Sequence, residues 1–280
     1  MMIKLLGKLI LFFFVSLVSV QAQYQLSSQF DYANTLFKTG NYFDAITEYK
    51  RLIFFDSTKT FFYRSSFQIG KCYKAGAKFD EAIKYFSISE LNASDDLERF
   101  DSKIEIVRCN ILRGTNSRAH QLLNEMELKY AGNDSKDSIN YWRGWAYMFE
   151  DDWTSAAASF AKINPNHELK SICDRVEKDK VSVTFATVIS YILPGAGQIY
   201  TGNFLSGLLS LGWNVLSAYF TINAFNAERI FDGIAILTLI WQRFYRGNIQ
   251  NAAEFAERKN IDIANSALIN LQKQFRGAKP

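Results

Sequence analysis

Residues 70–86 read GKCYKAGAKFDEAIKYF, and residues 144–160 read GWAYMFEDDWTSAAASF. Both stretches begin with glycine, carry alanine twelve residues later and end on phenylalanine four residues after that alanine. The same spacing of small and bulky residues recurs every 37 residues, at Ala33, Ala45 and Tyr49, at Gly70, Ala82 and Phe86, at Val107, Ala119 and Leu123, and at Gly144, Ala156 and Phe160. Small residues let two helices approach closely, and the bulky residue fills the remaining space. The period therefore predicts a stack of helix pairs.

Turn-forming residues divide this region into eight helices. The chain has three prolines, none of them before Pro165, which suits consecutive helices. Glycine, asparagine and aspartate fall between the apolar segments, where turns are expected. The first helices of the four pairs are predicted at 26–39, 60–75, 97–113 and 135–150, and the second helices at 42–55, 79–91, 116–130 and 153–163.

These helix pairs resemble the tetratricopeptide repeat. The residues that carry the resemblance are Gly70 and Tyr73 ahead of Phe79, Ala82 and Phe86, and Gly144 and Tyr147 ahead of Trp153, Ala156 and Phe160. The third repeat departs from the pattern at Val107 and Asn110, and the period is longer than the 34 residues of that family. The resemblance covers about residues 26–166.

The resemblance implies a groove, lined by the first helices, that holds a segment of a partner protein. Candidate groove residues are the positions on first helices that we expect to be exposed: Asn34, Arg64, Gln68, Lys71, Arg108 and Asn140. The alternative for each of them is an ordinary solvated helix face.

The first 22 residues have the pattern of an export signal. Lys4 and Lys8 precede an apolar run from Leu9 to Val20, and Ala22 supplies a small residue before a cleavage point. The run is short for a membrane span, although an uncleaved anchor is the alternative. We expect the mature chain to begin near Gln23.

The sequence contains no pattern typical of a catalytic or metal site. The three cysteines, Cys72, Cys109 and Cys173, lack metal-ligand spacing, and an odd number cannot form a complete set of internal disulfides. Cys72 and Cys109 are 37 residues apart, so they are either buried thiols in neighbouring repeats or a bridge. The two histidines have no partner at ligand spacing, so we expect no enzyme activity, no metal and no cofactor.

A second region begins with a long run without charge. Residues 181–227 contain no Asp, Glu, Lys, Arg or His over 47 residues, whereas charged residues make up 21% of the chain. Charges are costly at the centre of a bilayer. The segment 204–224 has the ~20 residues needed to cross, and a second apolar segment runs from Ile230 to about Tyr245. We predict a membrane hairpin, followed by an amphipathic helix over about 249–275.

A glycine-rich turn precedes the hairpin. Residues 194–203 read PGAGQIYTGN, with the marked positions Pro194, Gly195, Gly197, Gln198, Tyr200 and Gly202. This string, followed by two apolar helices, resembles small bacterial domains with two transmembrane helices. The match spans about residues 183–250 and implies no particular chemistry. A phosphate-binding loop is the alternative, but the Lys-Ser/Thr ending of such loops is missing.

Polar residues follow one face of the first span at steps of three and four: Ser206, Ser210, Asn214, Ser217 and Thr221. In the second span, Asp232, Ala235, Thr238 and Gln242 follow the same spacing. Helix packing explains such a stripe, and an ion or proton path is the alternative. Residues 181–193 either lie in the interface, which leaves two crossings, or extend through Ile199 and make a third.

Together these patterns predict an all-α chain with three parts: a signal peptide (1–22), a repeat domain (23–170) and a membrane domain (171–280). Its net charge of +4 has no basic cluster, which argues against nucleic acid. The expected function is a membrane-tethered adaptor that binds a protein partner. We expect it in the cytoplasmic membrane with its repeats on the extracytoplasmic side. A component of a transport system is the alternative.

Overall fold

The computed structural model describes residues 25–130 and 132–280, and these residues form helices and turns without a strand. The prediction of an all-α chain is therefore confirmed for the described residues. The chain divides into two compact units, which we call unit 1 (residues 25–167, with Pro280) and unit 2 (Glu168–Lys279). The predicted export signal lies outside the described residues.

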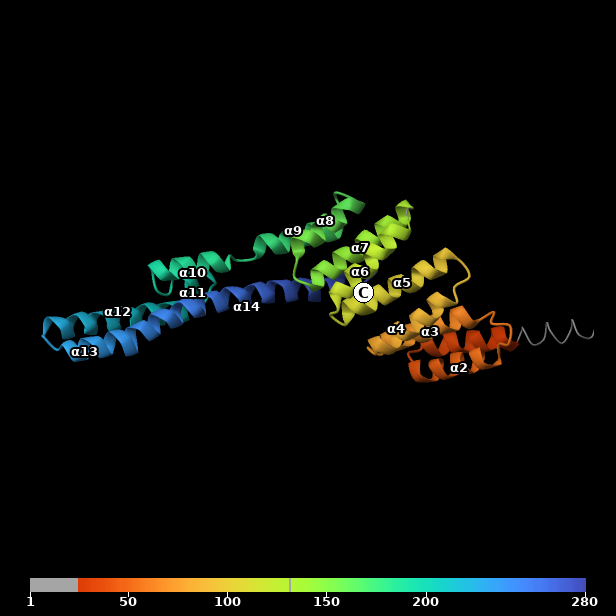
Figure 1. Ribbon diagram of the computed structural model, residues 1–280, viewed down its shortest axis with the longest axis horizontal. Coiled ribbons are helices and arrows are strands. Elements are labelled where there is room, and N and C mark those ends of the chain that lie inside the picture. Colours follow the sequence, from red (N-terminus) through yellow and green to blue (C-terminus); the bar gives the residue numbers. More distant parts are fainter. Residues whose placement is uncertain (1–24, 131) are drawn as a thin grey trace, which may run out of the picture. The chain divides into compact units, whose positions relative to one another are not determined.

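Unit 1 is a succession of eight helices, each packed on the next (Figure 1). The first covers residues 25–38. The others are α2 (Tyr42–Phe55), α3 (Phe62–Ala75), α4 (Phe79–Leu91), α5 (Asp96–Leu112), α6 (Asn116–Lys129), α7 (Asn133–Phe149) and α8 (Trp153–Ile163). The end of the first helix and every bound of α2 to α8 lie within two residues of those predicted from the 37-residue period.

The small and bulky positions of the period form the core of unit 1. The four alanines 37 residues apart are fully buried, and so are Tyr49, Phe86, Leu123 and Phe160. A Cβ atom added to Gly70 would lie 2.7 Å from the Phe86 ring, and one added to Gly144 would lie 2.5 Å from the Phe160 ring. Both distances are below van der Waals contact, so the glycines are what lets the bulky side chains fit.

The turn inside each helix pair repeats with the same period. Gly40, Ala77, Gly114 and Asp151 all have left-handed backbone, with φ values of 82°, 56°, 75° and 64°. The chain therefore reverses by one turn geometry in all four pairs, although only two of the four residues are glycine.

Unit 2 contains α9 (Glu168–Asp179), α10 (Val183–Ile192), the short α11 (Ala196–Tyr200) and the long α12 (Phe204–Asn226). A tight turn leads into α13 (Ile230–Ala235), a π-helical turn η1 (Ile236–Trp241) and α14 (Gln242–Gln274). Both α13 and η1 pack on α12, while α9, α10 and α11 pack on α14. The helix predicted over 249–275 is thus the C-terminal part of α14, which continues directly from the second apolar segment.

One helix among the described residues, α12, is long and apolar enough to cross a membrane. Only 22% of its most apolar window is buried, so α12 is not the core helix of unit 2. Its exposed side chains include Leu205, Leu208, Val215 and Ile222. Residues 181–193 could have begun a further crossing. They instead form α10, which ends at Ile192, before Pro194.

Candidate functional site

The expected groove residues of unit 1 differ in exposure. Arg64 is exposed, while Gln68, Lys71 and Arg108 are half-buried. Asn34 is half-buried, and its Oδ1 accepts a hydrogen bond from the Tyr49 hydroxyl at 2.6 Å. Asn140 is only 8% exposed, so the expectation that it lies on an open helix face is wrong. These residues therefore do not all belong to one accessible surface.

A cluster of charged and aromatic side chains joins the first helices of the first three repeats. Lys71 Nζ lies 5.5 Å from the ring centre of Phe37 and 6.0 Å from that of Phe67. Lys74 Nζ is 2.9 Å from Glu105 Oε2, and Arg108 also pairs with Glu105. Three of these side chains are cationic and one is a carboxylate, and Pro280 lines the same pocket. We call these residues, Phe37, Phe67, Lys71, Lys74, Glu105 and Arg108, the cationic cluster.

Burial shapes the electrostatics of the cationic cluster. Desolvation lowers the pKa of Lys74, although the neighbouring Glu105 carboxylate opposes that shift. The Arg108 guanidinium lies 4.7 Å from the ring centre of Trp142, a separation at which a cation is attracted to the ring face. An excess of positive charge, partly removed from water, favours an anionic ligand at this face.

In unit 2, the glycine-rich turn allows close backbone approach. Gly195 has a φ of 93°, and a Cβ atom there would lie 2.1 Å from the carbonyl oxygen of Gly207 on α12. A Cβ atom on Gly197 would lie 2.3 Å from the carbonyl oxygen of Ala186 and 2.6 Å from the Ala252 Cβ atom. Both glycines are therefore needed for packing. This packing role accounts for them without a phosphate ligand.

Asn248 on α14 is the centre of a buried hydrogen-bond network, which sequence reasoning missed. Its Oδ1 accepts hydrogen bonds from the Gly195 backbone N–H (2.7 Å), Gln198 Nε2 (3.1 Å) and Ser210 Oγ (3.0 Å). Its Nδ2 donates to the Ser190 carbonyl at 2.9 Å, and its own carbonyl accepts from Gln198 Nε2 at 2.9 Å. One side chain therefore ties α10, the glycine-rich turn, α11 and α12 to α14.

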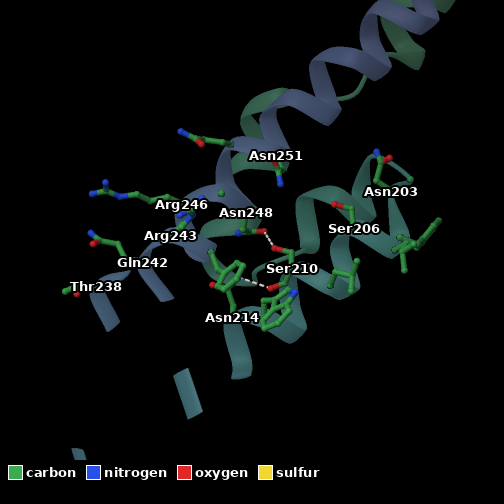
Figure 2. Close-up of a pocket in the computed structure, with 18 residues that line it drawn as sticks. Asn203, Ser206, Ser210, Asn214, Thr238, Gln242, Arg243, Arg246, Asn248 and Asn251 are labelled. Carbon is green, nitrogen blue, oxygen red and sulfur yellow. Dashed lines mark hydrogen bonds between the residues drawn. The ribbon is translucent and has the colours of Figure 1, made fainter. Parts of the chain in front are cut away.

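Beside Asn248 lies a groove of about 1230 Å³ between α12 and α14 (Figure 2). We call it the α12–α14 groove. Its polar lining includes Asn203, Ser206, Ser210, Asn214, Thr238, Gln242, Arg243, Arg246, Asn248, Gln250 and Asn251. The predicted polar stripe thus divides, because Ser206, Ser210 and Asn214 line the groove, whereas Ser217 and Thr221 are buried further along α12.

Of the other marked positions, Gln198 is buried within the Asn248 network, and Tyr200 is partly exposed beside Phe185. The Asp232 carboxylate is 59% exposed and lies 3.7 Å from Arg229, next to the turn between α12 and α13. Asp232 is thus not enclosed between helices, as an acid on an ion path would be.

No group of His, Cys, Asp and Glu side chains within the described part of the chain could hold a metal ion. Cys72, Cys109 and Cys173 are buried free thiols, so no bridge joins Cys72 to Cys109. Burial raises the pKa of each thiol to about 12, which leaves it protonated at neutral pH. Buried, protonated thiols are poor nucleophiles.

Comparisons with protein-family models, curated proteins and solved structures gave no match. The protein is therefore described by its fold and its candidate sites alone. Over residues 25–130 and 132–280 it is an all-helical protein of two units, one built from helix pairs with a cationic cluster and one with an exposed apolar helix beside a polar groove.

Proposed function

We propose that this chain is a membrane-tethered adaptor. In this account unit 1 is an array of tetratricopeptide-type repeats that binds a partner protein on the extracytoplasmic side. The hairpin of α12 and α13 with η1 holds the chain in the cytoplasmic membrane. Tethering raises the concentration of the bound partner at the membrane without additional contacts.

The observation that carries the tether is the exposure of α12. A helix of 23 residues that is mostly apolar and mostly unburied has no favourable place in water. The glycine-rich turn and the Asn248 network support the tether, because they fix the start of α12 against α14 through satisfied polar contacts.

The cationic cluster supports a proposal for the kind of partner segment that unit 1 binds. Lys71, Lys74 and Arg108 outnumber the single carboxylate of Glu105, and Phe37 and Phe67 offer apolar contact beside them. We therefore infer that the partner offers an acidic segment. No specific observation favours transport, because Asp232 lies at an exposed turn beside Arg229.

Site-specific photocrosslinking in intact cells tests partner binding. Arg64 lies on α3, the first helix of the second pair, and a photoreactive residue in its place should yield a protein adduct. The same photoreactive residue at the exposed Lys84, on the second helix α4, should yield none. The Lys71→Glu change should abolish the Arg64 adduct, since it reverses one charge of the cationic cluster. Equal adducts from Arg64 and Lys84, or an adduct that survives Lys71→Glu, would contradict the proposal.

A further inference from the structure

One side of the hairpin carries four exposed polar side chains. They are Thr238, Gln242, Arg243 and Arg246, which we call the hairpin polar face. Figure 2 shows them on the side of the hairpin away from α12. Within residues 25–130 and 132–280 neither arginine forms an ion pair or a hydrogen bond, and the Gln242 amide forms no hydrogen bond.

The hairpin polar face lies beside the apolar length of α12 and not beyond its end. Phe244, next to Arg243, stacks on Trp213 of α12 with ring centres 5.1 Å apart. Trp213 is nine residues from Phe204, the first residue of α12, which is about 14 Å at 1.5 Å per residue. If α12 crosses a hydrocarbon layer of about 30 Å, this level is well inside it.

The two arginines at this depth require an anionic partner. A charged side chain is costly near the centre of a bilayer, so intramembrane charges are almost always paired. The hairpin itself supplies no acid there, because residues 204–227 and 233–253 contain no Asp or Glu. Asp232 is eleven residues from Arg243, about 16 Å along the helix, and lies beside Arg229. The carboxylate or phosphate that pairs with the arginines therefore comes from outside the hairpin.

Gln242 favours a protein partner over a lipid. An arginine can bend toward lipid phosphates, because long side chains reach the interface from inside a bilayer. Gln242 is one turn deeper than Arg246 and ten residues, or about 15 Å, from Asp232 near the opposite end. No headgroup reaches that level, whereas side-chain amides hydrogen-bond between helices there. A hollow of about 400 Å³ beside Gln242 leaves room for side chains of a second helix.

A second copy of this chain is a poor occupant of the hairpin polar face. Two copies that met through this face would bring four arginines together at one depth, and like charges across an interface cost several kcal/mol. Neither copy offers an acid at that depth to offset the repulsion. The face is therefore complementary to a different helix, one that carries negative charge.

We propose that the hairpin polar face binds a transmembrane helix of another protein, and that this helix carries a carboxylate. Arg243 and Arg246 donate to the carboxylate, in the forked geometry that arginine offers. Gln242 hydrogen-bonds to the same helix. The proposal rests on the membrane hairpin of the proposed function, and it makes that hairpin a binding element as well as a tether.

Energy transfer in phosphatidylcholine vesicles tests the proposal with a designed probe. The full chain carries an acceptor dye on Glu228→Cys. The probe is a donor-labelled leucine–alanine peptide as long as α12, with glutamate, glutamine or leucine at one position at the depth of the arginines. The glutamate peptide should bind at least about tenfold more tightly than the leucine peptide, with the glutamine peptide between them, because hydrogen bonds to charged groups are the strongest.

Variants of the hairpin polar face make the test specific. The double change Arg243→Gln and Arg246→Gln should weaken binding of the glutamate peptide at least about tenfold. Gln242→Leu should weaken it about threefold, as expected for one hydrogen bond between helices. The matched control is Arg229→Gln with Arg258→Gln, two exposed arginines of unit 2 outside the face, which should leave binding unchanged.

Four results would overturn the proposal. They are equal binding of the glutamate and leucine peptides, full binding by the double arginine variant, energy transfer between two labelled chains without peptide, which indicates a second copy, and loss of peptide binding when phosphatidylglycerol is added, which indicates a lipid phosphate. Carbonate washing of the same vesicles separates this failure from that of the tether. A chain that is washed off refutes both proposals, whereas a retained chain that does not distinguish the peptides refutes only this one.

Discussion

A single residue in each helix pair adopts left-handed backbone, and in the second pair that residue is alanine. Ala77 has a φ of 56°, whereas Gly40 and Gly114 occupy the equivalent turns of the first and third pairs. A residue with a Cβ atom pays about 1–2 kcal/mol for this conformation, and glycine does not. The backbone conformation of this turn therefore costs more free energy with alanine at position 77 than it would with glycine.

We predict that Ala77→Gly stabilises unit 1 by about 1 kcal/mol, since it removes this penalty. Thermal unfolding of the full chain, followed by circular dichroism, should show a midpoint about 2–4 °C higher. The matched change Ala75→Gly, two residues earlier in α3, should lower the midpoint because glycine is unfavourable in a helix. A lower midpoint for Ala77→Gly would contradict the argument.

Asn248 gives a prediction at the same scale in unit 2. Changing it to alanine leaves the Ser190 carbonyl, the Gly195 N–H and the Ser210 hydroxyl without their present partner. We expect Asn248→Ala to cost on the order of 3 kcal/mol, given about 1–3 kcal/mol for each buried orphan. Asn251→Ala, at an exposed position on the same helix, should be nearly neutral. Similar unfolding midpoints for the two variants in detergent would show that the network does not stabilise unit 2.

The three buried thiols predict how stability changes at high pH. Desolvation raises their pKa from 9.0 to about 12, so the folded chain keeps these protons after the unfolded chain has lost them. A raised pKa in the folded state means that stability falls as pH rises from about 9 to 12. A variant with all three cysteines changed to alanine should lose less stability over that range in urea unfolding. Parallel pH profiles for the two proteins would contradict this expectation.

At the scale of elements, the helices of unit 1 follow from local rules and those of unit 2 only in part. The bounds of eight helices were predictable, because small and bulky residues recur with one period and turn residues separate the helices. The continuity of α14 was not predicted, since the apolar segment was expected to end near Tyr245 and a separate amphipathic helix to begin near 249. Asn248 is instead held inside the helix by partners 38 to 58 residues away, a relation that no local pattern contains.

The candidate sites show the same limit. Arg64 and Lys71 could be placed on first helices from the period, but the burial of Asn140 depends on neighbouring helices. The polar stripe of α12 was visible as a spacing, whereas its division between the groove and a buried contact was not. Spacing thus predicts which helix face a residue shares, and tertiary packing decides what covers that face.

The turn between α12 and α13 gives a prediction for the hairpin. Glu228 is exposed in this turn and lies at the end of α12 opposite to the glycine-rich turn. If α12 crosses the membrane, Glu228→Cys should react with a membrane-impermeant maleimide only after the cytoplasmic side is opened. Lys84→Cys in unit 1 should react in intact spheroplasts. The natural cysteines are buried and should not interfere. Labelling of Glu228→Cys in intact spheroplasts would contradict this topology.

At the scale of the whole molecule, the proposed adaptor combines a partner-binding array and a membrane anchor in one chain. The two units differ in what they leave exposed. Unit 1 buries its apolar repeat positions and presents charged and aromatic side chains. Unit 2 leaves the apolar side of α12 uncovered and buries polar residues such as Asn214 and Asn248. A bilayer accounts for this inversion better than water does.

Alkaline carbonate extraction of membranes tests the tether most directly. The mature chain, shown by intact mass to have lost residues 1–22, should stay in the membrane pellet because its hairpin is embedded in the hydrocarbon. Removing the signal first excludes the N-terminal apolar run as the anchor. Release of the mature chain into the carbonate supernatant would contradict the account.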